Sequence, residues 1–427
     1  MRHVLLSILV FSQAGAAEPV QFADPNLDYA VRIELNFPPE GLTDENLLLL
    51  TNLNACCSGI VDLGGLEYAH ALETLDLSFN SLQQLTFPVG LSNLLTIKLN
   101  GNAMTSLQWP TDLRRLRRLE LGENELSDFS GLSTMKALDT LNLEYNNLSA
   151  LTLPVTLTNL LLLNLAHNRV QDFNSLEPFF ALGYLHLDDN GLRSLSLPQS
   201  FTNLMSLTLS INRITNFAFL TKLSLLYFLD VSANFLSTAD LPSDLPYLNW
   251  INLSENRLRH FNAPSGWGNL VTLHLRDNFL TNVCVEGLPN LETLDLIVNQ
   301  LTNVFIPPGS PRLHSVDLRW NPLAAFSLPQ GLAEGYLANL VDQLQSQGVQ
   351  VQTFSESVRL WNARTAGPSF EFDLEGPPGW YHVLQSHDLQ TWTSGEPRWK
   401  DFAPAHVAAP RTSTEQFFRV VRASVCP

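Results

Sequence analysis

The chain has 427 residues, of which 45% are hydrophobic and 15% are charged, and it carries a formal net charge of −17. This hydrophobic share excludes a disordered chain, and the length exceeds what one core usually serves, so we expect several domains or an array of repeats. Only 24 lysines and arginines stand against 41 acidic residues, which argues against a nucleic-acid partner, because binding a phosphate backbone requires clustered cations.

The first residues have the pattern of a secretory signal peptide. Arg2 precedes a short apolar run at residues 4–11, and the small residues at 14–17 provide a cleavage site. The run is too short to span a bilayer, and no later apolar stretch is long enough. We therefore expect residues 1–17 to be removed near Ala16–Ala17, and the mature protein to be secreted or held at the cell envelope without a transmembrane segment.

Two local signals after this segment predict helices. Asp24 followed by Pro25 marks a helix start, since an aspartate caps the first N–H groups and proline fits the first helical position. Thr43 with two acidic residues after it is a second start, because acidic side chains are favourable near a helix N-terminus. Residues 18–58 are therefore expected to form a helical N-terminal segment.

A leucine-based motif then recurs along most of the chain. The segment Leu72–Asn80 has the pattern L-x-x-L-x-L-x-x-N, and twelve copies follow one another at a spacing of 22 residues, with one spacing of 21. This fixed period is that of leucine-rich repeats, so we expect a solenoid over residues 59–331. The asparagines that close the motif are Asn80, Asn102, Asn124, Asn146, Asn168, Asn190, Asn212, Asn234, Asn256, Asn278, Asn299 and Asn321.

The pattern predicts which side chains each repeat buries. The L-x-L alternation places both leucines on one face of a short strand and the residue between them on the other. One repeat cannot bury its leucines alone, so stacked repeats form a parallel sheet over a continuous core. The asparagine amide can satisfy buried backbone groups of neighbouring turns. The predicted fold class is an α/β-type leucine-rich-repeat solenoid with a parallel sheet on its concave side.

The return segments between the strands are of two kinds. Most carry a proline eight residues after the asparagine, and the others have an apolar residue there, as in Asp128–Leu132. Because proline lacks a backbone donor and fixes φ, we expect these return arms to be extended or turn-like. The prolines are Pro88, Pro110, Pro154, Pro198, Pro242, Pro264, Pro307 and Pro329.

The pattern changes after the last repeat. Residues 332–345 have apolar side chains at helical spacing, which predicts an amphipathic helix that caps the last repeat, so that residues 332–357 form a cap and linker. Short alternating segments then predict a small all-β domain at residues 358–427. The strand candidates in this domain are residues 370–374, 380–384 and 417–421.

The four cysteines are too few for a disulfide framework in a chain of this length. A bond between the adjacent Cys56 and Cys57 would strain the backbone, and Cys284 and Cys426 lie far away in the sequence. Although export would permit disulfides, we expect four thiols without a functional role. The sequence has no CxxC motif or Cys/His cluster that would indicate a metal site.

The 22-residue repeats resemble those of bacterial secreted leucine-rich-repeat proteins of the internalin type. The segments Phe22–Leu35 and Leu42–Glu45 are similar to the helical cap of such proteins. The series from Gly379 to Trp392, which ends in Phe417–Arg419, is similar to a C-terminal module of secreted bacterial proteins. The resemblance implies a helical N-terminal cap, a repeat array that recognises a partner, and a small C-terminal β domain.

The residues between the leucines face the concave side, so we expect a ligand there. In repeats five to nine, the position before the second leucine mostly holds a bulky side chain. Strands stack about 4.8 Å apart, so Phe228 and Trp250 can touch, and Tyr184 lies about 10 Å from Phe228. Exposed aromatics amid polar residues are typical of binding hot spots. The candidate ligand-binding residues are Tyr184, His186, Asp188, Phe228, Asp230, Trp250, Asn252, His274 and Arg276, with a second candidate patch at Arg319 and Trp320.

No residue pattern indicates catalysis. Nucleophile, zinc-protease and phosphate-loop motifs are absent from the sequence, and His186 and His274 lie four strands apart, roughly 20 Å, too far to share a metal. We therefore expect no catalytic residues, cofactor or metal, and an exported protein that binds a protein or peptide on its concave face. The alternatives are a cell-surface polysaccharide-binding component and, if the N-terminus is not a signal, an intracellular scaffold.

Overall fold

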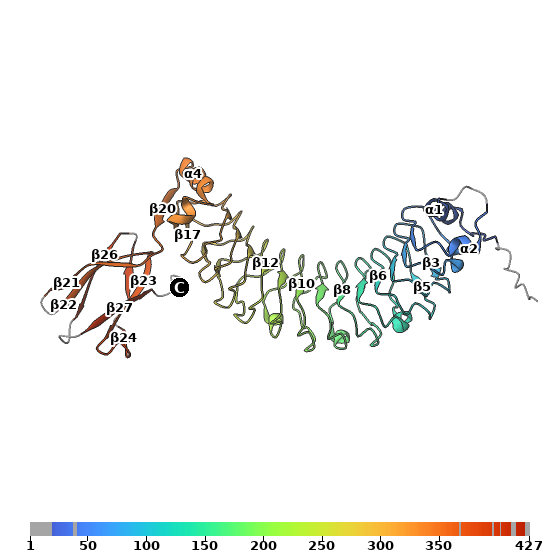
Figure 1. The fold of residues 1–427 in the computed structure, drawn as a ribbon, viewed down its shortest axis with the longest axis horizontal. Coiled ribbons are helices and arrows are strands. Elements are labelled where there is room, and N and C mark those ends of the chain that lie inside the picture. Colours follow the sequence, from blue (N-terminus) through green and yellow to red (C-terminus); the bar gives the residue numbers. More distant parts are fainter. Residues whose placement is uncertain are drawn as a thin grey trace, which may run out of the picture. The chain divides into compact units, whose positions relative to one another are not determined.

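The computed structural model describes residues 19–36, 41–366, 369–394, 397–401, 403–410 and 416–422. The predicted signal peptide, residues 1–17, lies outside the described residues. The chain forms two compact units, Met1–Asn164 and Leu165–Pro427 (Figure 1). In the described part of the chain, no helix is both long and apolar enough to cross a membrane.

Two short helices precede the repeats in the first unit. α1 (Pro25–Leu35) begins where the sequence indicates, because one carboxylate oxygen of Asp24 accepts hydrogen bonds from two N–H groups of the first helical turn. The other oxygen of Asp24 accepts a hydrogen bond from the N–H of Val61 at 2.6 Å. α2 (Asp44–Leu47) is capped by Thr43. The Asp24 carboxylate therefore joins α1 to the first turn of the solenoid.

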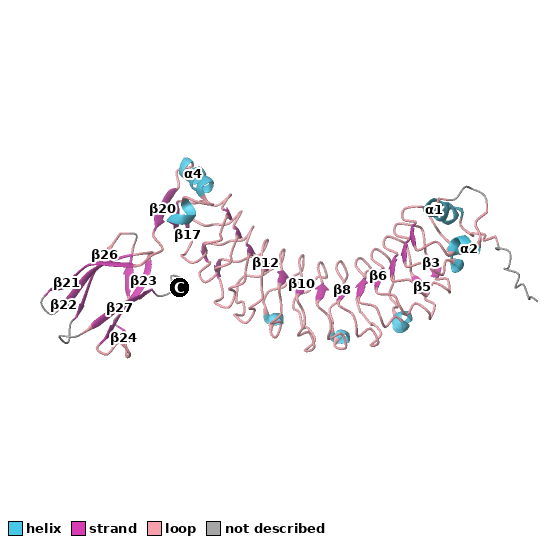
Figure 2. Ribbon diagram, in the orientation of Figure 1, coloured by secondary structure: helices cyan, strands magenta, loops and turns pink. Residues whose placement is uncertain are grey.

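Short parallel strands form a sheet in both units, drawn in magenta in Figure 2. Neighbouring strands pair in register at the repeat spacing, as Phe228 does with Trp250. The predicted leucine-rich-repeat solenoid with a parallel sheet is confirmed. The first unit has the order β1 (Asn52–Asn54), β2 (Thr74–Asp76), β4 (Thr96–Lys98), β6 (Arg118–Glu120), β7 (Thr140–Asn142) and β8 (Leu162–Asn164). The second has β9 (Tyr184–His186), β10 (Ser206–Thr208), β11 (Phe228–Asp230), β12 (Trp250–Asn252), β14 (Thr272–His274), β16 (Thr293–Asp295) and β18 (Ser315–Asp317).

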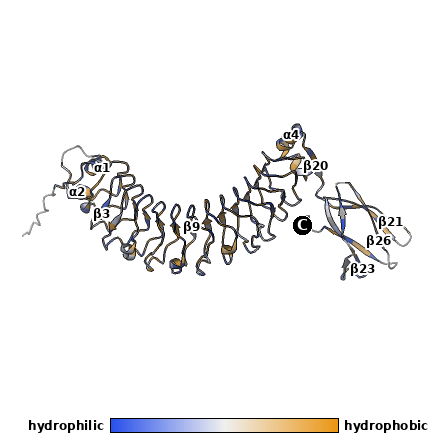
Figure 3. Cartoon of the chain, turned by 180° about the vertical axis from the view of Figure 1, so that it is seen from behind, coloured by the Kyte–Doolittle hydropathy of each residue, from blue (hydrophilic) through white to orange (hydrophobic). Residues whose placement is uncertain are grey.

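The leucines of the motif form the core in both units. Leu75 and Leu77 have no exposed surface, and the corresponding Leu273 and Leu275 are equally buried. Hydrophobic and hydrophilic residues alternate within the turns of the solenoid (Figure 3). Since each buried side chain contributes roughly 1.5–3 kcal/mol, these columns supply most of the favourable free energy of folding.

The closing asparagines hydrogen-bond each repeat to the one before it. Nδ2 of Asn256 donates to the carbonyls of Val231 in the preceding repeat and Leu253 in its own, at 2.9 and 3.1 Å. Its Oδ1 accepts a hydrogen bond from the N–H of Leu236, also in the preceding repeat, at 3.0 Å. The role predicted for these amides is therefore confirmed. The buried members of the series are Asn102, Asn124, Asn146, Asn168, Asn190, Asn212, Asn234, Asn256, Asn278 and Asn299.

The return arms follow their two sequence types. Several arms with a proline are extended strands, such as β13 (His260–Asn262), whereas arms with the apolar residue form short 3-10 helices, such as η2 (Ser130–Thr134). This difference agrees with the fixed φ and missing donor of proline. The other extended arms with a proline are β3 (Gln84–Thr86), β5 (Ser106–Gln108), β17 (Asn303–Phe305) and β19 (Ala325–Pro329). β15 (Asn282–Cys284) is an exception, because its arm is extended although it has Glu286 in place of the proline. The remaining 3-10 helices are η1 (Leu66–Tyr68), η3 (Asn174–Leu176) and η4 (Ala218–Leu220).

The segment after the last repeat differs from the single helix predicted at residues 332–345. It contains two helices, α3 (Gln330–Ala333) and α4 (Ala338–Ser346). Between them, Leu337 has a non-helical backbone conformation and is only 2% exposed. The prediction of one continuous helix is wrong, because a turn directs Leu337 into the core. β20 (Gln350–Phe354) then pairs with β19 in the return-arm ladder.

The C-terminal part of the second unit contains two small antiparallel sheets. One consists of β21, β22 and β26, and in the other β23 pairs with β24, β25 and β27. Phe372, Tyr381 and Val407 belong to their common core. The strands are β21 (Arg359–Ala366), β22 (Ser369–Glu375), β23 (Gly379–Ser386), β24 (Thr393–Ser394), β25 (Arg398–Lys400), β26 (Ala405–Pro410) and β27 (Phe417–Arg422).

The expectation of four free thiols is wrong for Cys284, which is disulfide-bonded at the end of β15. A long separation in sequence does not exclude pairing, because folding decides which cysteines meet. Cys56 and Cys57 are free, and the hydrogen bond between their sulfur atoms, 2.6 Å apart, raises the pKa of Cys56 to about 11. Cys426 lies outside the described residues.

Candidate functional site

An aromatic stack lies on the sheet face of the second unit, the side on which the residues between the motif leucines lie. The rings of Phe228 and Trp250 are parallel within 3°, with their centroids 4.1 Å apart. His274, on the next strand, packs at a tilt against Trp250, with a centroid distance of 5.4 Å. In-register pairing of β11, β12 and β14 produces this arrangement, because equivalent side chains of adjacent repeats become neighbours.

Tyr184 is separated from this stack by one strand. β10 lies between β9 and β11, and it places the small Ser206 beside both Tyr184 and Phe228. Tyr184 is 42% exposed, whereas Ser206 is only 9% exposed between its larger neighbours. The predicted aromatic set therefore consists of a compact stack and one separate ring, with the small, buried Ser206 between them.

Hydrogen bonds between neighbouring repeats fix the predicted polar residues on β9 and directly after it. The carboxylate of Asp188 accepts hydrogen bonds from the N–H and the hydroxyl of Ser210, both at 2.7 Å, and from the hydroxyl of Thr208. Nδ1 of His186 lies 3.1 Å from the same Thr208 hydroxyl. Thr208 therefore bridges His186 and Asp188, and sequence reasoning did not identify this residue.

A second set of polar contacts follows along β11 to β14. Asp230 accepts a hydrogen bond from the Nδ2 of Asn252 at 3.4 Å, and it also accepts from the backbone N–H and hydroxyl of Ser232. Nδ1 of His274 lies 3.6 Å from a carboxylate oxygen of Asp295, while Arg276 is exposed. These contacts hold the polar side chains in fixed positions beside the aromatic stack, which suits recognition of a defined surface.

The described side chains of this face do not form a metal-binding cluster. Among the described residues, no group of three His, Cys, Asp or Glu side chains could hold a metal ion. β10, β11 and β12 separate the strands of His186 and His274. The two histidines therefore do not form a common site.

A hollow of about 310 Å³ lies beside the aromatic stack, and the sequence did not reveal it. Tyr227 and Tyr247 line it and are 52% and 55% exposed. Tyr227 directly precedes Phe228 in the sequence. A second bulky residue directly before the aromatic position of the motif is therefore the sequence signal that could have identified this hollow. The other lining residues are Asn249, Asn269, Val271, Asn290 and Arg312.

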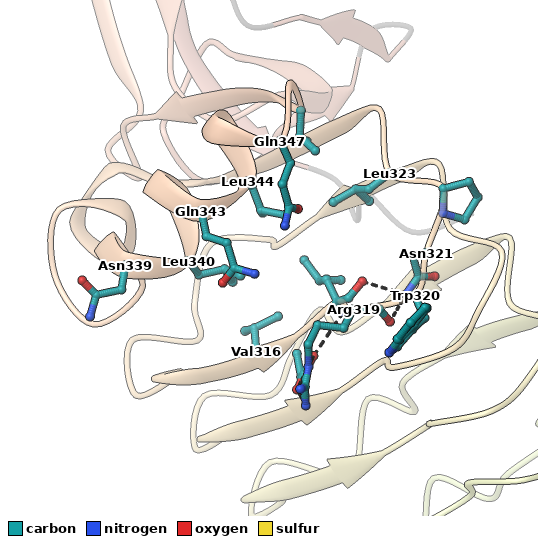
Figure 4. Close-up of a pocket in the computed structure, with 14 residues that line it drawn as sticks. Val316, Arg319, Trp320, Asn321, Leu323, Asn339, Leu340, Gln343, Leu344 and Gln347 are labelled. Atoms are coloured by element: carbon teal, nitrogen blue, oxygen red, sulfur yellow. Dashed lines mark hydrogen bonds and ion pairs between the residues drawn. The ribbon is translucent and has the colours of Figure 1, made fainter.

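The second candidate patch borders a larger cavity of about 750 Å³ between β18 and α4 (Figure 4). Burial opposes ionisation of Asp317, but hydrogen bonds from Arg319 at 2.7–3.0 Å lower the pKa of this carboxyl below its ordinary value. Trp320 is 79% exposed at the rim. The side chains contributed by α4, among them Leu340 and Gln343, were not predicted, because their position depends on the break between α3 and α4.

Comparison with known proteins supports the fold assignment. Residues 71–94 match the leucine-rich repeat family, and no curated protein matches the chain. Among solved structures, the chain is similar to the internalin InlF of Listeria monocytogenes, with 23% identity, a TM-score of 0.64, and coverage of 81% of this chain and 100% of that one. It is also similar to the functional domain of InlJ from the same organism, with 20% identity, a TM-score of 0.52, and coverage of 74% and 76%. Both similarities show that the chain has the leucine-rich-repeat solenoid fold of these internalins.

Proposed function

We propose that this protein is an exported, non-catalytic binding protein that recognises a protein or peptide partner through the aromatic stack of Phe228 and Trp250. The stack carries the proposal, because it presents large, rigid apolar side chains amid fixed polar groups. Such aromatic anchors dominate the energetics of protein interfaces. The partner contacts that we propose involve the full set of candidate residues on β9 to β14.

The small side chain of Ser206 between two aromatic residues supports a specific mode of contact. Tyr184 and Phe228 lie on strands two spacings apart, about 10 Å, with the small serine between them. This spacing accommodates one planar group between the two rings, since stacked aromatics prefer centroid distances of about 4.5–7 Å. We propose that an aromatic side chain of the partner inserts there.

Two observations support export. The N-terminal sequence has the charged, apolar and small-residue regions of a signal peptide. Cys284 is disulfide-bonded, and disulfides persist mainly in oxidising compartments outside the cytosol. The proposed location is therefore extracellular or at the cell envelope.

Replacing Trp250 with alanine is expected to weaken binding of the partner roughly 30-fold or more, because the change removes an anchor and leaves Phe228 unsupported. A partner captured from envelope and medium fractions provides the binding assay. Tyr29→Ala is the matched control, since Tyr29 is an exposed aromatic on α1, 67% exposed, and outside the face. Unchanged binding by a Tyr184, Phe228 and Trp250 triple alanine variant would rule out this site.

Ser206→Phe tests the insertion mode separately. The new ring occupies the position between Tyr184 and Phe228, so the partner should lose its contact there. Because Ser206 is only 9% exposed, thermal unfolding of the variant checks that the protein still folds. We expect partner binding to fall at least as much as with Trp250→Ala, in the same assay. Full binding by the Ser206→Phe variant would contradict the insertion of a partner side chain at this point.

A polysaccharide ligand is the second candidate, and the hollow beside the stack favours it. Exposed Tyr227 and Tyr247 lie there with three asparagines, and such rings and amides suit sugar faces and hydroxyl groups. The Phe228 and Trp250 rings cover one face of each other, which leaves less flat aromatic surface for a sugar. Glycan-array binding that is lost in Tyr247→Ala and kept in Trp250→Ala would favour the polysaccharide.

A further inference from the structure

The parallel sheet of the second unit ends at β18, and its hydrogen-bond pattern shows what this edge can accept. Within the ladder, the N–H of Leu296 donates to the carbonyl of Asp317, and the N–H of Val298 donates to that of Arg319, at 2.9 and 3.0 Å. Both groups thus point from one repeat toward the next. Leu318 and Trp320 occupy the equivalent positions one repeat later, so their N–H groups point away from β16 and toward the open edge.

This edge has no strand partner among the described residues. Nothing in the described part of the chain accepts a hydrogen bond from the N–H of Leu318 or Trp320. Backbone groups of alternate residues along a strand point to the same side. The N–H and carbonyl of Val316, two residues before Leu318, therefore also face the edge, where no strand follows among the described residues. A row of unpaired backbone groups on an edge strand is a template for pairing with another chain.

Helix α4 covers this edge with side chains but does not pair with it. Leu340, Gln343 and Leu344 of α4 line the cavity of about 750 Å³ opposite Val316 (Figure 4). The backbone groups of a helix interior are hydrogen-bonded along the helix itself, so α4 cannot satisfy those of β18. The expected capping helix therefore leaves a space with leucine and amide side chains of α4 on one side and unpaired strand groups on the other.

We infer that this cavity binds an extended peptide of a partner protein, which adds a parallel strand to β18. The peptide's carbonyls accept hydrogen bonds from the N–H groups of Leu318 and Trp320, and one of its N–H groups donates to the carbonyl of Val316. Peptide side chains in line with Val316 face Leu340 and Leu344 of α4, so the peptide has apolar residues at these alternate positions. This inference is independent of the function proposed for the aromatic stack.

A synthetic peptide tests the pairing directly. The probe is a fluorescein-labelled copy of Leu291–Asn299, whose L-x-L pattern forms the equivalent pairs inside the ladder. We expect saturable binding to the full-length protein by fluorescence anisotropy. N-methylation of the peptide's aspartate blocks the N–H that faces Val316 and should weaken binding roughly tenfold or more. N-methylation of the preceding leucine, whose N–H faces away from β18, should leave the affinity unchanged.

Protein variants locate the binding to this cavity. Gln343→Trp fills the space between α4 and β18 and should abolish peptide binding, and Trp320→Ala should weaken it. Tyr145→Ala is the matched control, because Tyr145 occupies the same motif position as Trp320 and has a similar positive φ, 52° against 62°. Three results would each overturn the inference. The peptide fails to bind up to about millimolar concentration, or the two N-methylations weaken its binding equally. In the third, the peptide fails to bind while the protein associates with itself and Trp320→Ala abolishes that association.

Discussion

Replacing Asn256 with alanine is expected to lower the free energy of unfolding by about 3–5 kcal/mol, because the change leaves several buried backbone groups without partners at about 1–3 kcal/mol each. The groups affected are the carbonyls of Val231 and Leu253 and the N–H of Leu236. Asn256 is only 5% exposed, so water cannot easily replace its amide. Urea denaturation followed by circular dichroism measures the loss, and hydrogen exchange at the Leu236 amide should accelerate specifically.

An exposed asparagine in the same repeat array provides the control. Asn262 lies on the return-arm strand β13 and is exposed. Its replacement by alanine should change the stability by no more than about 0.5 kcal/mol, as is usual for surface positions. If Asn256→Ala were as stable as this control, the amide ladder would not contribute to stability as we describe.

Replacing Asp24 with alanine is expected to destabilise the first unit by about 2–4 kcal/mol. The change removes the N-cap of α1, typically worth about 1 kcal/mol, and also removes the acceptor of the N–H groups of Val61 and Asp62. Asp24→Asn separates the two contributions, because asparagine caps helices well but turns an N–H₂ group toward Val61. Thermal and urea unfolding of both variants measure these losses. Asp28→Ala, which breaks a partly exposed i,i+4 pair with Arg32 and leaves the N-cap of α1 in place, should cost no more than about 1 kcal/mol.

The contribution of Asp24 should depend on pH in a defined direction. Burial opposes ionisation of this carboxyl, but hydrogen bonds from the N–H groups of Val61, Asn26 and two other residues lower its pKa below the ordinary value. The stabilisation is therefore present above the unfolded-state pKa of about 3.9, and it is lost as the pH falls from there through the lower folded-state pKa. The stability difference between the wild type and Asp24→Asn should shrink over that acidic range. An unchanged difference down to pH 2 would contradict the ionised cap.

The repeat period made most of the fold predictable from sequence. Stacking of the repeats is the only way to bury the leucines and to pair the asparagine amides at their fixed spacing. Motif positions such as Leu75 and Asn256 therefore have the same kind of buried surroundings from one repeat to the next. The α1 start at Pro25 was also predictable, because it depends on neighbouring residues. The break between α3 and α4 was not, because burial of Leu337 in the assembled end of the solenoid overrides the helical spacing of the apolar residues there.

The candidate site was predictable only where it follows the repeat geometry. The stacking of Phe228 on Trp250 follows from strand spacing, because both occupy the same motif position in adjacent repeats. The hollow at Tyr247 does not follow from that rule, since Tyr247 lies before the strand, in a segment whose path varies between repeats. The disulfide of Cys284 likewise depends on contacts between segments that share no periodic relation.

The one repeat of 21 residues shows where this architecture tolerates a change of length. Oδ1 of Asn299 still accepts a hydrogen bond from the N–H of Leu280 at 3.0 Å, and its Nδ2 still reaches the carbonyl of Leu275 at 3.0 Å. The missing residue is therefore absorbed by the return arm, while the amide contacts to the neighbouring turn stay intact. In evolutionary terms, such a gene can lengthen by duplicating whole units, and small deletions survive when they fall in the arms and spare the stretch from the first leucine to the asparagine.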